Sequence, residues 1–236
     1  MTPDPRDTAL LRACPCVAMP CYGELAQAEI GQRVLVASNG VFLEVRRAWL
    51  DCVVRISALR DTPPLPYGAL AERLSFTFGV IPVALLDEFV AVGRDALPNE
   101  VAGALIYDRT SNSLRLVVHE AVRAGPAEVH YLMPALGPGE ELAVDLHTHG
   151  RLPAFWSATD DADDQGVKVC GVFGDVHREA PSAAFRLAIN GAFWDLPHPW
   201  SSQRGGSAPT PEFDAEQLTR LATRLTELTE ISPWNT

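Results

Sequence analysis

The chain has 236 residues, 47% of them hydrophobic and 21% charged, which is the balance of a packed globular protein with one large domain or a core domain and an appendage. Its formal net charge of -11 argues against a general nucleic-acid binder, because few cations are available to replace the counterions of phosphates. The same charge disfavours docking on an anionic membrane and favours a partner with a basic surface.

Two features of the sequence indicate a cytoplasmic protein. No apolar run reaches the roughly 20 residues that a membrane-spanning helix needs, and residues 1–12 contain acids and prolines before any apolar stretch, unlike a secretory signal. The five cysteines are an odd number, which favours reduced thiols. Cys14, Cys16 and Cys21 lie close together, but no fourth ligand of matching spacing is near, so we interpret them as packing residues rather than a metal site.

The first part of the chain is predicted to be rich in β-structure. Prolines recur through the first 20 residues and predict that no long element forms there. Asn39-Gly40 stands between two apolar, alternating runs, residues 33–37 and 41–46, which predicts a hairpin, and residues 49–56 are predicted to be a further strand. The proline-rich segment 62–66 predicts an extended linker.

The pattern changes from residue 81 onward. Apolar residues at helical spacing predict a helix over residues 85–96, which ends before Pro98. Apolar runs of strand length follow, at residues 101–107, 114–119, 129–133, 142–149, 167–173 and 184–189. A segment rich in serine and glycine, residues 201–210, then links to an amphipathic helix predicted over residues 211–230.

Two histidines and an aspartate predict a metal site. In a strand, residues two apart point to the same face, so His147 and His149 can present both imidazoles to one ion. Asp160 follows after a loop long enough to fold back over the strand end. Two histidines and one carboxylate suit a catalytic zinc ion, since they leave a fourth position for water, whose pKa the zinc lowers toward neutrality.

Two further residues are candidates for catalysis. Glu100 lies where the predicted helix gives way to the first core strand, and there it can take a proton from water and deliver it to a leaving amine. Ser157 can donate a hydrogen bond to a developing oxyanion. The alternatives are a surface carboxylate for Glu100, a cap or turn residue for Ser157, and an N-cap for Asp160 at a helix beginning at residue 161. Glu88 competes with Glu100 as the base but lies in the middle of the helix.

Several neighbouring polar residues have ordinary explanations. Asp145 either orients an imidazole or is a solvated strand residue. The acidic run Asp161, Asp163 and Asp164 is interpreted as a solvated face. Residues 155–156 either contact a substrate or anchor their loop. The remaining histidines have no partners at ligand spacing and are interpreted as structural: His119, His130, His177 and His198.

The pattern resembles the JAMM metalloprotease motif of the JAB1/MPN (Mov34) family, which is a Glu and then His-x-His, seven residues, Ser, two residues and Asp. His147, His149, Ser157 and Asp160 match this spacing without a gap, and residues 98–105 resemble the segment that carries the Glu, here Glu100. The resemblance covers about residues 77–200, which leaves residues 1–76 as a β-rich N-terminal extension and residues 201–236 as a linker with a C-terminal amphipathic helix. One departure is Tyr107-Asp108, where the family often has a glycine.

The resemblance implies an α/β fold of the cytidine-deaminase-like type, with a curved mixed sheet and flanking helices. It implies zinc as cofactor and hydrolysis of isopeptide bonds to ubiquitin or ubiquitin-like proteins. Residues 38–47 and the long N-terminal extension resemble, more narrowly, protein A of the PRTRC system, a bacterial plasmid-associated cluster that also encodes a ThiF/E1-like protein and a small ubiquitin-like protein. The implied substrate is then the C-terminus of that ubiquitin-like protein, with the ThiF/E1-like protein as a further partner.

Two other functions remain open. MPN-type domains also serve as interaction scaffolds, although these usually lack some of the metal ligands. A small-molecule zinc amidase would use the same ligand set. A base deaminase is disfavoured, because the Pro-Cys-x-x-Cys pattern of its zinc site does not occur in this chain.

Overall fold

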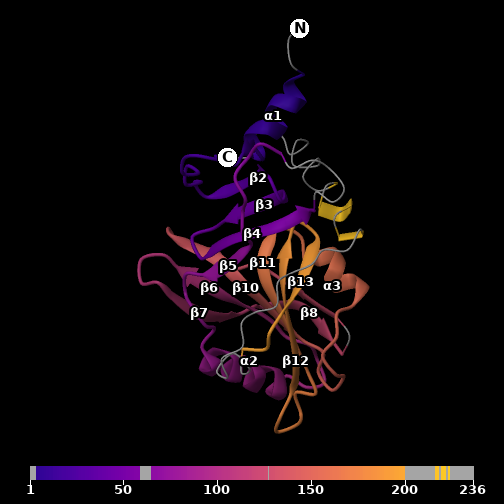
Figure 1. Cartoon of the computed structure of the whole chain (residues 1–236). Coiled ribbons are helices and arrows are strands. Elements are labelled where there is room, and N and C mark those ends of the chain that lie inside the picture. Colours follow the sequence, from indigo (N-terminus) through magenta and orange to yellow (C-terminus); the bar gives the residue numbers. More distant parts are fainter. Residues whose placement is uncertain are drawn as a thin grey trace. The chain divides into compact units, whose positions relative to one another are not determined.

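The computed structural model (Figure 1) describes residues 4–58, 65–126 and 128–199, and, nearer the C-terminus, residues 216, 217, 219–221 and 223. The chain divides into two compact units. The described residues up to Thr77 form the first unit together with those between 216 and 223, and residues 78–199 form the second. No helix in these described parts is long and apolar enough to cross a membrane.

The first unit contains a five-stranded sheet in the order β1-β2-β3-β4-β5. Its strands are β1 (Cys16–Ala18), β2 (Gly31–Ala37), β3 (Gly40–Arg46), β4 (Leu50–Ser57) and β5 (Arg73–Phe76). The predicted Asn-Gly hairpin is confirmed, since β2 and β3 pair antiparallel with Ala37 opposite Gly40. The predicted strand at residues 49–56 is β4. The sequence did not predict β1, which pairs parallel with β2, or β5, which pairs with β4.

A helix at the N-terminus corrects one expectation. Prolines were expected to prevent a long element, but α1 (Pro5–Ala13) begins directly at a proline. Pro5 occupies the first turn, where a missing N–H costs nothing, and the Asp4 side chain caps the helix by accepting a hydrogen bond from the Arg6 amide.

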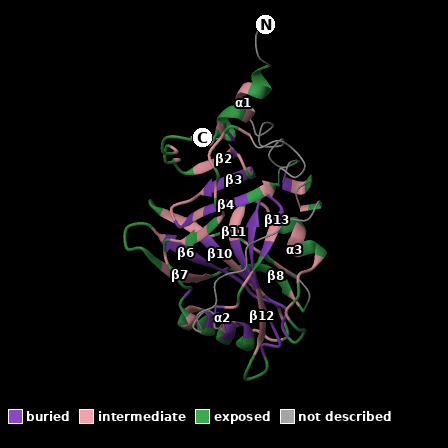
Figure 2. Cartoon of the chain, viewed as in Figure 1, coloured by how far each residue is buried: buried purple, intermediate pink, exposed green. Residues whose placement is uncertain are grey.

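Burial in the first unit follows the strands β3 and β4 (Figure 2). Part of its core is the buried cluster Leu35, Ala37, Phe42 and Val53. The linker predicted at residues 62–66 lies mostly, and the one predicted at 201–210 wholly, outside the described residues. Most of the helix predicted over residues 211–230 also lies outside them; its described residues, 216, 217, 219–221 and 223, are helical.

The second unit is built on a six-stranded mixed sheet in the order β13-β12-β11-β10-β6-β7, beside a two-stranded sheet β8-β9. Its elements are α2 (Val83–Asp95), β6 (Ala102–Asp108), β7 (Ser113–Val118), β8 (Ala121–Gly125), β9 (Glu128–Tyr131), β10 (Glu140–Thr148), α3 (Ala158–Asp163), β11 (Val167–Gly174), β12 (Ser182–Ile189) and β13 (Ala192–Leu196). Only the β10–β11 pair of the six-stranded sheet is parallel. The predicted α/β class with a mixed sheet is confirmed.

The helix and strands predicted from residue 81 onward are all present, and β8 and β13 are additional. The residues of β8 are exposed or half-exposed, so no apolar alternation marks the strand in the sequence. Strand β13 has five residues and continues from β12 through a two-residue turn at Asn190 and Gly191, which joins two apolar runs closely.

Helix α2 packs on one face of the six-stranded sheet. It buries Leu86, Phe89, Val90 and Gly93, which are spaced to lie on one side of the helix. The Phe89 ring lies 5.8 Å from that of Phe173 on β11. A Cβ added at Gly93 would lie 2.8 Å from Thr148 Cγ2, so the helix lies directly over the end of β10. Because side chains alternate along a strand, α2 covers the face opposite to the one to which His147 points.

Substituting Gly93→Ala tests this close approach. Alanine ordinarily stabilises a helix interior by about 1 kcal/mol relative to glycine. Here the added methyl group meets Thr148, and we expect a net loss of about 1–3 kcal/mol in the free energy of unfolding, measured by chemical denaturation. Ala91→Gly at an exposed position of the same helix is the control and should lose only the propensity difference. A stabilised Gly93→Ala variant would contradict the packing described.

Candidate metal centre

The structure brings together the three predicted metal ligands. His147 is the next-to-last residue of β10 and His149 follows the strand directly; their Nε2 atoms are 3.2 Å apart. Asp160, on α3, places Oδ1 3.2 Å from His147 Nε2 and Oδ2 3.9 Å from His149 Nε2. Donor atoms of all three residues lie within 4.8 Å of one another, so the group can hold a metal ion.

The distances suit a tetrahedral ion. Zinc bonds to nitrogen and oxygen at about 2.0–2.2 Å, which separates two ligand atoms of a tetrahedral site by about 3.3 Å. The two separations of 3.2 Å, between the His147 and His149 nitrogens and between His147 Nε2 and Asp160 Oδ1, agree with that value. Three protein ligands leave the fourth position of such a site open.

The protonation states also favour metal binding. Burial, followed by the neighbouring His147, lowers the pKa of His149, which keeps its imidazole in the neutral form that binds metals. Burial alone would raise the pKa of Asp160, but the hydrogen bond and charge of His147 and the Ser157 amide hold it well below its usual range. At neutral pH the aspartate is therefore ionised and the buried histidine neutral.

A capping box orients Asp160. The Ser157 hydroxyl accepts a hydrogen bond from the Asp160 amide (3.2 Å), and Asp160 Oδ2 accepts one from the Ser157 amide (2.6 Å). Ser157 is therefore the N-cap of α3, as expected from the alternative in which it is a cap residue. The alternative in which Asp160 is the N-cap is wrong, because the helix begins at Ala158 and Asp160 is its third residue.

The loop between the histidines and Asp160 folds over the end of β11. Gly174 permits this, since a Cβ there would lie 2.1 Å from the Ala154 amide nitrogen. The Ala154 amide donates to Ser182 Oγ (2.8 Å), and the Asp175 amide donates to the Leu152 carbonyl (2.7 Å). These contacts bring the chain from the end of β10 back to α3. Apart from the glycine itself, no pattern in the sequence predicts these contacts.

Glu100 lines the same cavity, of about 380 Å³, as the two histidines and Asp160. It is only 9% exposed, so the alternative of a surface carboxylate is wrong. Burial raises the pKa of Glu100 to about 7; His147 opposes this rise and Asp160 adds to it. A carboxyl with such a pKa can both accept and release a proton near neutral pH.

Thr148, between the two histidines, ties the Glu100 segment to their strand. Its Oγ1 accepts a hydrogen bond from the Val101 amide (3.0 Å), and its own amide donates to the Val101 carbonyl (2.9 Å). The side chain of Thr148 is fully buried. Glu100 is the neighbour of Val101, and both histidines are neighbours of Thr148, so this pair of hydrogen bonds holds Glu100 close to the histidines. The sequence analysis missed this link.

Thr148→Val, which keeps the shape of the side chain, should leave the Val101 N–H buried without an acceptor. We expect a loss of about 1–3 kcal/mol in the free energy of unfolding, measured by urea denaturation. Thr110→Val at an exposed position should change it by less than about 0.5 kcal/mol. Equal stability of the Thr148→Val variant and the unchanged protein would show that this hydrogen bond does not hold the segment.

The acidic residues around the site are paired rather than solvated. Asp145 was expected to orient an imidazole or to be solvated; instead its Oδ2 lies 2.5 Å from Lys168 Nζ, which also lies 3.0 Å from Asp164 Oδ1. Burial alone would lower the pKa of Lys168, but the charge of Asp145 and other negative groups raises it above its usual value. The lysine therefore stays charged and holds both carboxylates.

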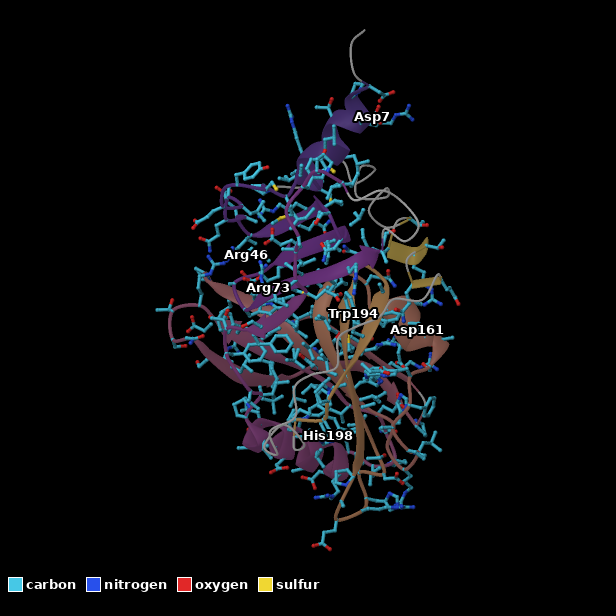
Figure 3. The ribbon with its side chains drawn as sticks, in the orientation of Figure 1. Asp7, Arg46, Arg73, Asp161, Trp194 and His198 are labelled. Carbon is cyan, nitrogen blue, oxygen red and sulfur yellow. The ribbon has the colours of Figure 1, made fainter. Side chains whose placement is uncertain are left out.

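The expectation of a solvated acidic run on residues 161–164 is also corrected. Asp161, labelled in Figure 3, and Asp164 both pair with Arg186 of β12. Only Asp163 is exposed, as expected. The signal that could have found this arrangement is the arginine itself, since a cation within the apolar run 184–189 must find carboxylate partners if that strand is buried.

The aromatic residues of the loop take different positions. Phe155 is 47% exposed and lines the cavity, with its ring 4.5 Å from that of His149. The Trp156 ring lies edge-to-face with the His147 ring, with the ring centroids 6.2 Å apart, and it also contacts Arg186, so Trp156 anchors the loop.

The other histidines lie outside the metal group. His119 is buried and stacks on Tyr131, with ring centroids 4.4 Å apart. His130 lines the cavity, and His177 is exposed. His198, labelled in Figure 3, meets the Phe185 ring at 5.8 Å.

Comparison with known proteins gives two family matches. Residues 82–188 match the family described as prokaryotic homologs of the JAB domain, and residues 4–77 match a domain family of unknown function, DUF2016. Among solved structures, the chain is similar to the solution structure of protein DSY2949 from Desulfitobacterium hafniense, with 19% sequence identity and a TM-score of 0.37 over 48% of this chain and 85% of that chain. No curated protein matches the sequence significantly.

Proposed function

We propose that this chain, whose residues 82–188 match the prokaryotic homologs of the JAB domain, contains a zinc-dependent peptidase that hydrolyses an isopeptide or peptide bond. The observation that carries the proposal is the group His147, His149 and Asp160, which has metal-ligand geometry and shares a cavity with the buried carboxyl of Glu100.

The metal group and Glu100 have separate roles in this reaction. When bound to the three ligands, a zinc ion supplies Lewis acidity, which polarises a carbonyl oxygen and makes water acidic near neutral pH. Glu100 accepts a proton from the attacking water and delivers it to the leaving amine.

Ser157 can combine its structural role with a catalytic one. Its Oγ accepts a hydrogen bond from the Asp160 amide, and this bond does not use the hydroxyl proton. A hydroxyl both accepts and donates, so Ser157 can cap α3 and also donate a hydrogen bond to the oxyanion of the substrate.

We further propose that the substrate is the C-terminal tail of a ubiquitin-like protein in a system with a ThiF/E1-like protein. This rests on the resemblance of the motif and of residues 38–47 to that group. Leu152 and Phe155 support a polypeptide substrate, because they line the cavity and are 52% and 47% exposed, which leaves apolar surface beside the site for an extended chain. The net charge of -11 favours a partner with a basic face and disfavours nucleic acid or a membrane.

Metal content is the first test of the proposal. Purified protein should contain about one zinc ion per chain, and the double variant His147→Ala/His149→Ala should contain none. His177→Ala, which removes an exposed histidine of the same unit, should retain the zinc. Elemental analysis measures all three. Well-folded protein that takes up no zinc even when zinc is added would leave an interaction scaffold as the better account.

The pH dependence of cleavage tests the role of Glu100. A base works in its ionised form, and burial raises the pKa of Glu100 to about 7, so kcat/KM should fall about tenfold per pH unit below that value and level off above it. Glu100→Gln should lower kcat by about 10²–10⁴-fold with zinc retained. The assay follows cleavage of a fusion to the C-terminus of the ubiquitin-like protein.

Glu88→Gln is the matched control, because Glu88 is exposed in the middle of α2, and it should cleave at the unchanged rate. Full activity of Glu100→Gln, or a profile flat down to pH 5, would contradict the assignment of Glu100 as the base.

A further inference from the structure

Arg186 joins strand β12 to the helix that carries Asp160. Its Nη1 lies 2.6 Å from Asp161 Oδ1, its Nη2 lies 2.6 Å from Asp164 Oδ2, and its Nε lies 3.2 Å from the same Asp164 oxygen. The arginine is 3% exposed. The bonds to Asp164 are buried and the bond to Asp161 is partly buried, so these charge-assisted bonds are stronger than ion pairs on the surface.

Helix α3 depends on such outside contacts. It has six residues, far fewer than the roughly 12–15 that an isolated helix needs to be stable in water. The capping box at Ser157 fixes its first turn, but it does not attach the helix to the rest of the unit. Asp161 directly follows Asp160, and Asp164 donates its amide to the Asp160 carbonyl (2.8 Å), so the two partners of Arg186 adjoin the metal ligand in the chain and across one helical turn.

The sheet places Arg186 on the side of the ligands. Arg186 pairs with Cys170, and Cys170 pairs with Asp145, which lies two residues before His147 on β10. Side chains in the same row of a sheet share a face, as do residues two apart along a strand. The guanidinium therefore lies on the face to which His147 points, and it holds α3 against that face.

Arg186 also supports His147, through the ring of Trp156. The guanidinium carbon lies 3.9 Å from the ring centroids of both Trp156 and Phe193, so the arginine is held between two aromatic rings. The Trp156 ring in turn meets the His147 ring edge-on at 6.2 Å. Arg186 thus supports both the aspartate and one of the histidines of the metal group through residues that it contacts directly.

We propose that Arg186 is a positioning residue for metal binding, which fixes Asp160 at ligating distance from His147 and His149. The inference rests on the proposed metal site and deepens it. Arg186 touches neither the metal nor the substrate, so it acts on affinity only through the helix and Trp156.

The test compares Arg186→Met with Arg94→Met, a variant of the same type in the same unit. Arg94 donates to the carbonyls of Val176 (2.7 Å) and Arg178 (2.8 Å) and touches no residue of α3. Zinc affinity is measured by competition with a chelator, and thermal unfolding of the metal-free protein is measured alongside. Arg186→Met should weaken zinc binding by about 10- to 100-fold, and Arg94→Met should leave zinc binding unchanged.

Arg186→Lys keeps the charge and is included in case the methionine variant does not fold. An ammonium group cannot bridge two carboxylates as a guanidinium fork does, so its zinc affinity should fall between those of the unchanged protein and Arg186→Met. Wild-type affinity in a folded Arg186 variant would overturn the proposal, because the arginine would then be only a structural residue.

Amide exchange of the metal-free protein separates this proposal from the proposed function. The Ser157 amide is bonded to the Asp160 carboxylate, so its exchange reports the position of Asp160 without any metal. Exchange should accelerate in Arg186→Met and Arg186→Lys and not in Arg94→Met. If the protein bound no zinc while this exchange result held, the metal function would fail and the positioning of Asp160 by Arg186 would stand; unchanged exchange in both Arg186 variants would overturn the positioning.

Discussion

The arrangement of the site follows from how the end of β10 satisfies its backbone hydrogen bonds. A central strand must find partners on both sides. On one side Thr148 exchanges hydrogen bonds with Val101, which brings in the segment of Glu100. On the other side the His149 amide donates to the Phe173 carbonyl (2.7 Å), so the chain continues along β11 for one more residue before the loop turns back toward Asp160. Glu100 and the two histidines therefore meet because they lie at adjacent ends of the paired strands β6 and β10, and the loop that folds over the end of β11 brings Asp160 of α3 to them.

Because side chains alternate along β10, the two faces of the sheet are stabilised by different interactions. Thr148 points toward α2, where only a glycine, Gly93, allows the helix to approach, and this face is filled by apolar packing such as Phe89 against Phe173. The face of His147 is held differently, by ion pairs and aromatic contacts around Arg186. Packing on one face makes the strand rigid, and directional polar contacts on the other set the orientation of the ligands.

Local patterns predicted the fold and the proximity of His147, His149 and Asp160, and they failed where a partner lies far away in the sequence. His-x-His in a strand determines that both imidazoles share a face, and the apolar runs gave the helix and the central strands. The acidic run was interpreted as solvated because runs of charged residues usually are; one partner, Arg186, stands 22 residues after Asp164 on another strand. Likewise, Asp160 was placed as a possible cap because spacing does not say at which residue a six-residue helix begins; the capping box with Ser157 decides it.

The ion pairs also explain which carboxylates remain for chemistry. Of the five acidic residues that line the cavity, Asp145 and Asp164 are paired with Lys168 and Arg186, and Asp163 is exposed. Glu100 and Asp160 pair with no described lysine or arginine, and their surroundings move their pKa values in opposite directions, that of Asp160 well below its usual range and that of Glu100 to about 7. A permanently ionised carboxylate suits a metal ligand, and one that titrates near neutrality suits a proton carrier. Two cations thus leave, among the carboxylates of the cavity that are not exposed, one that suits each role.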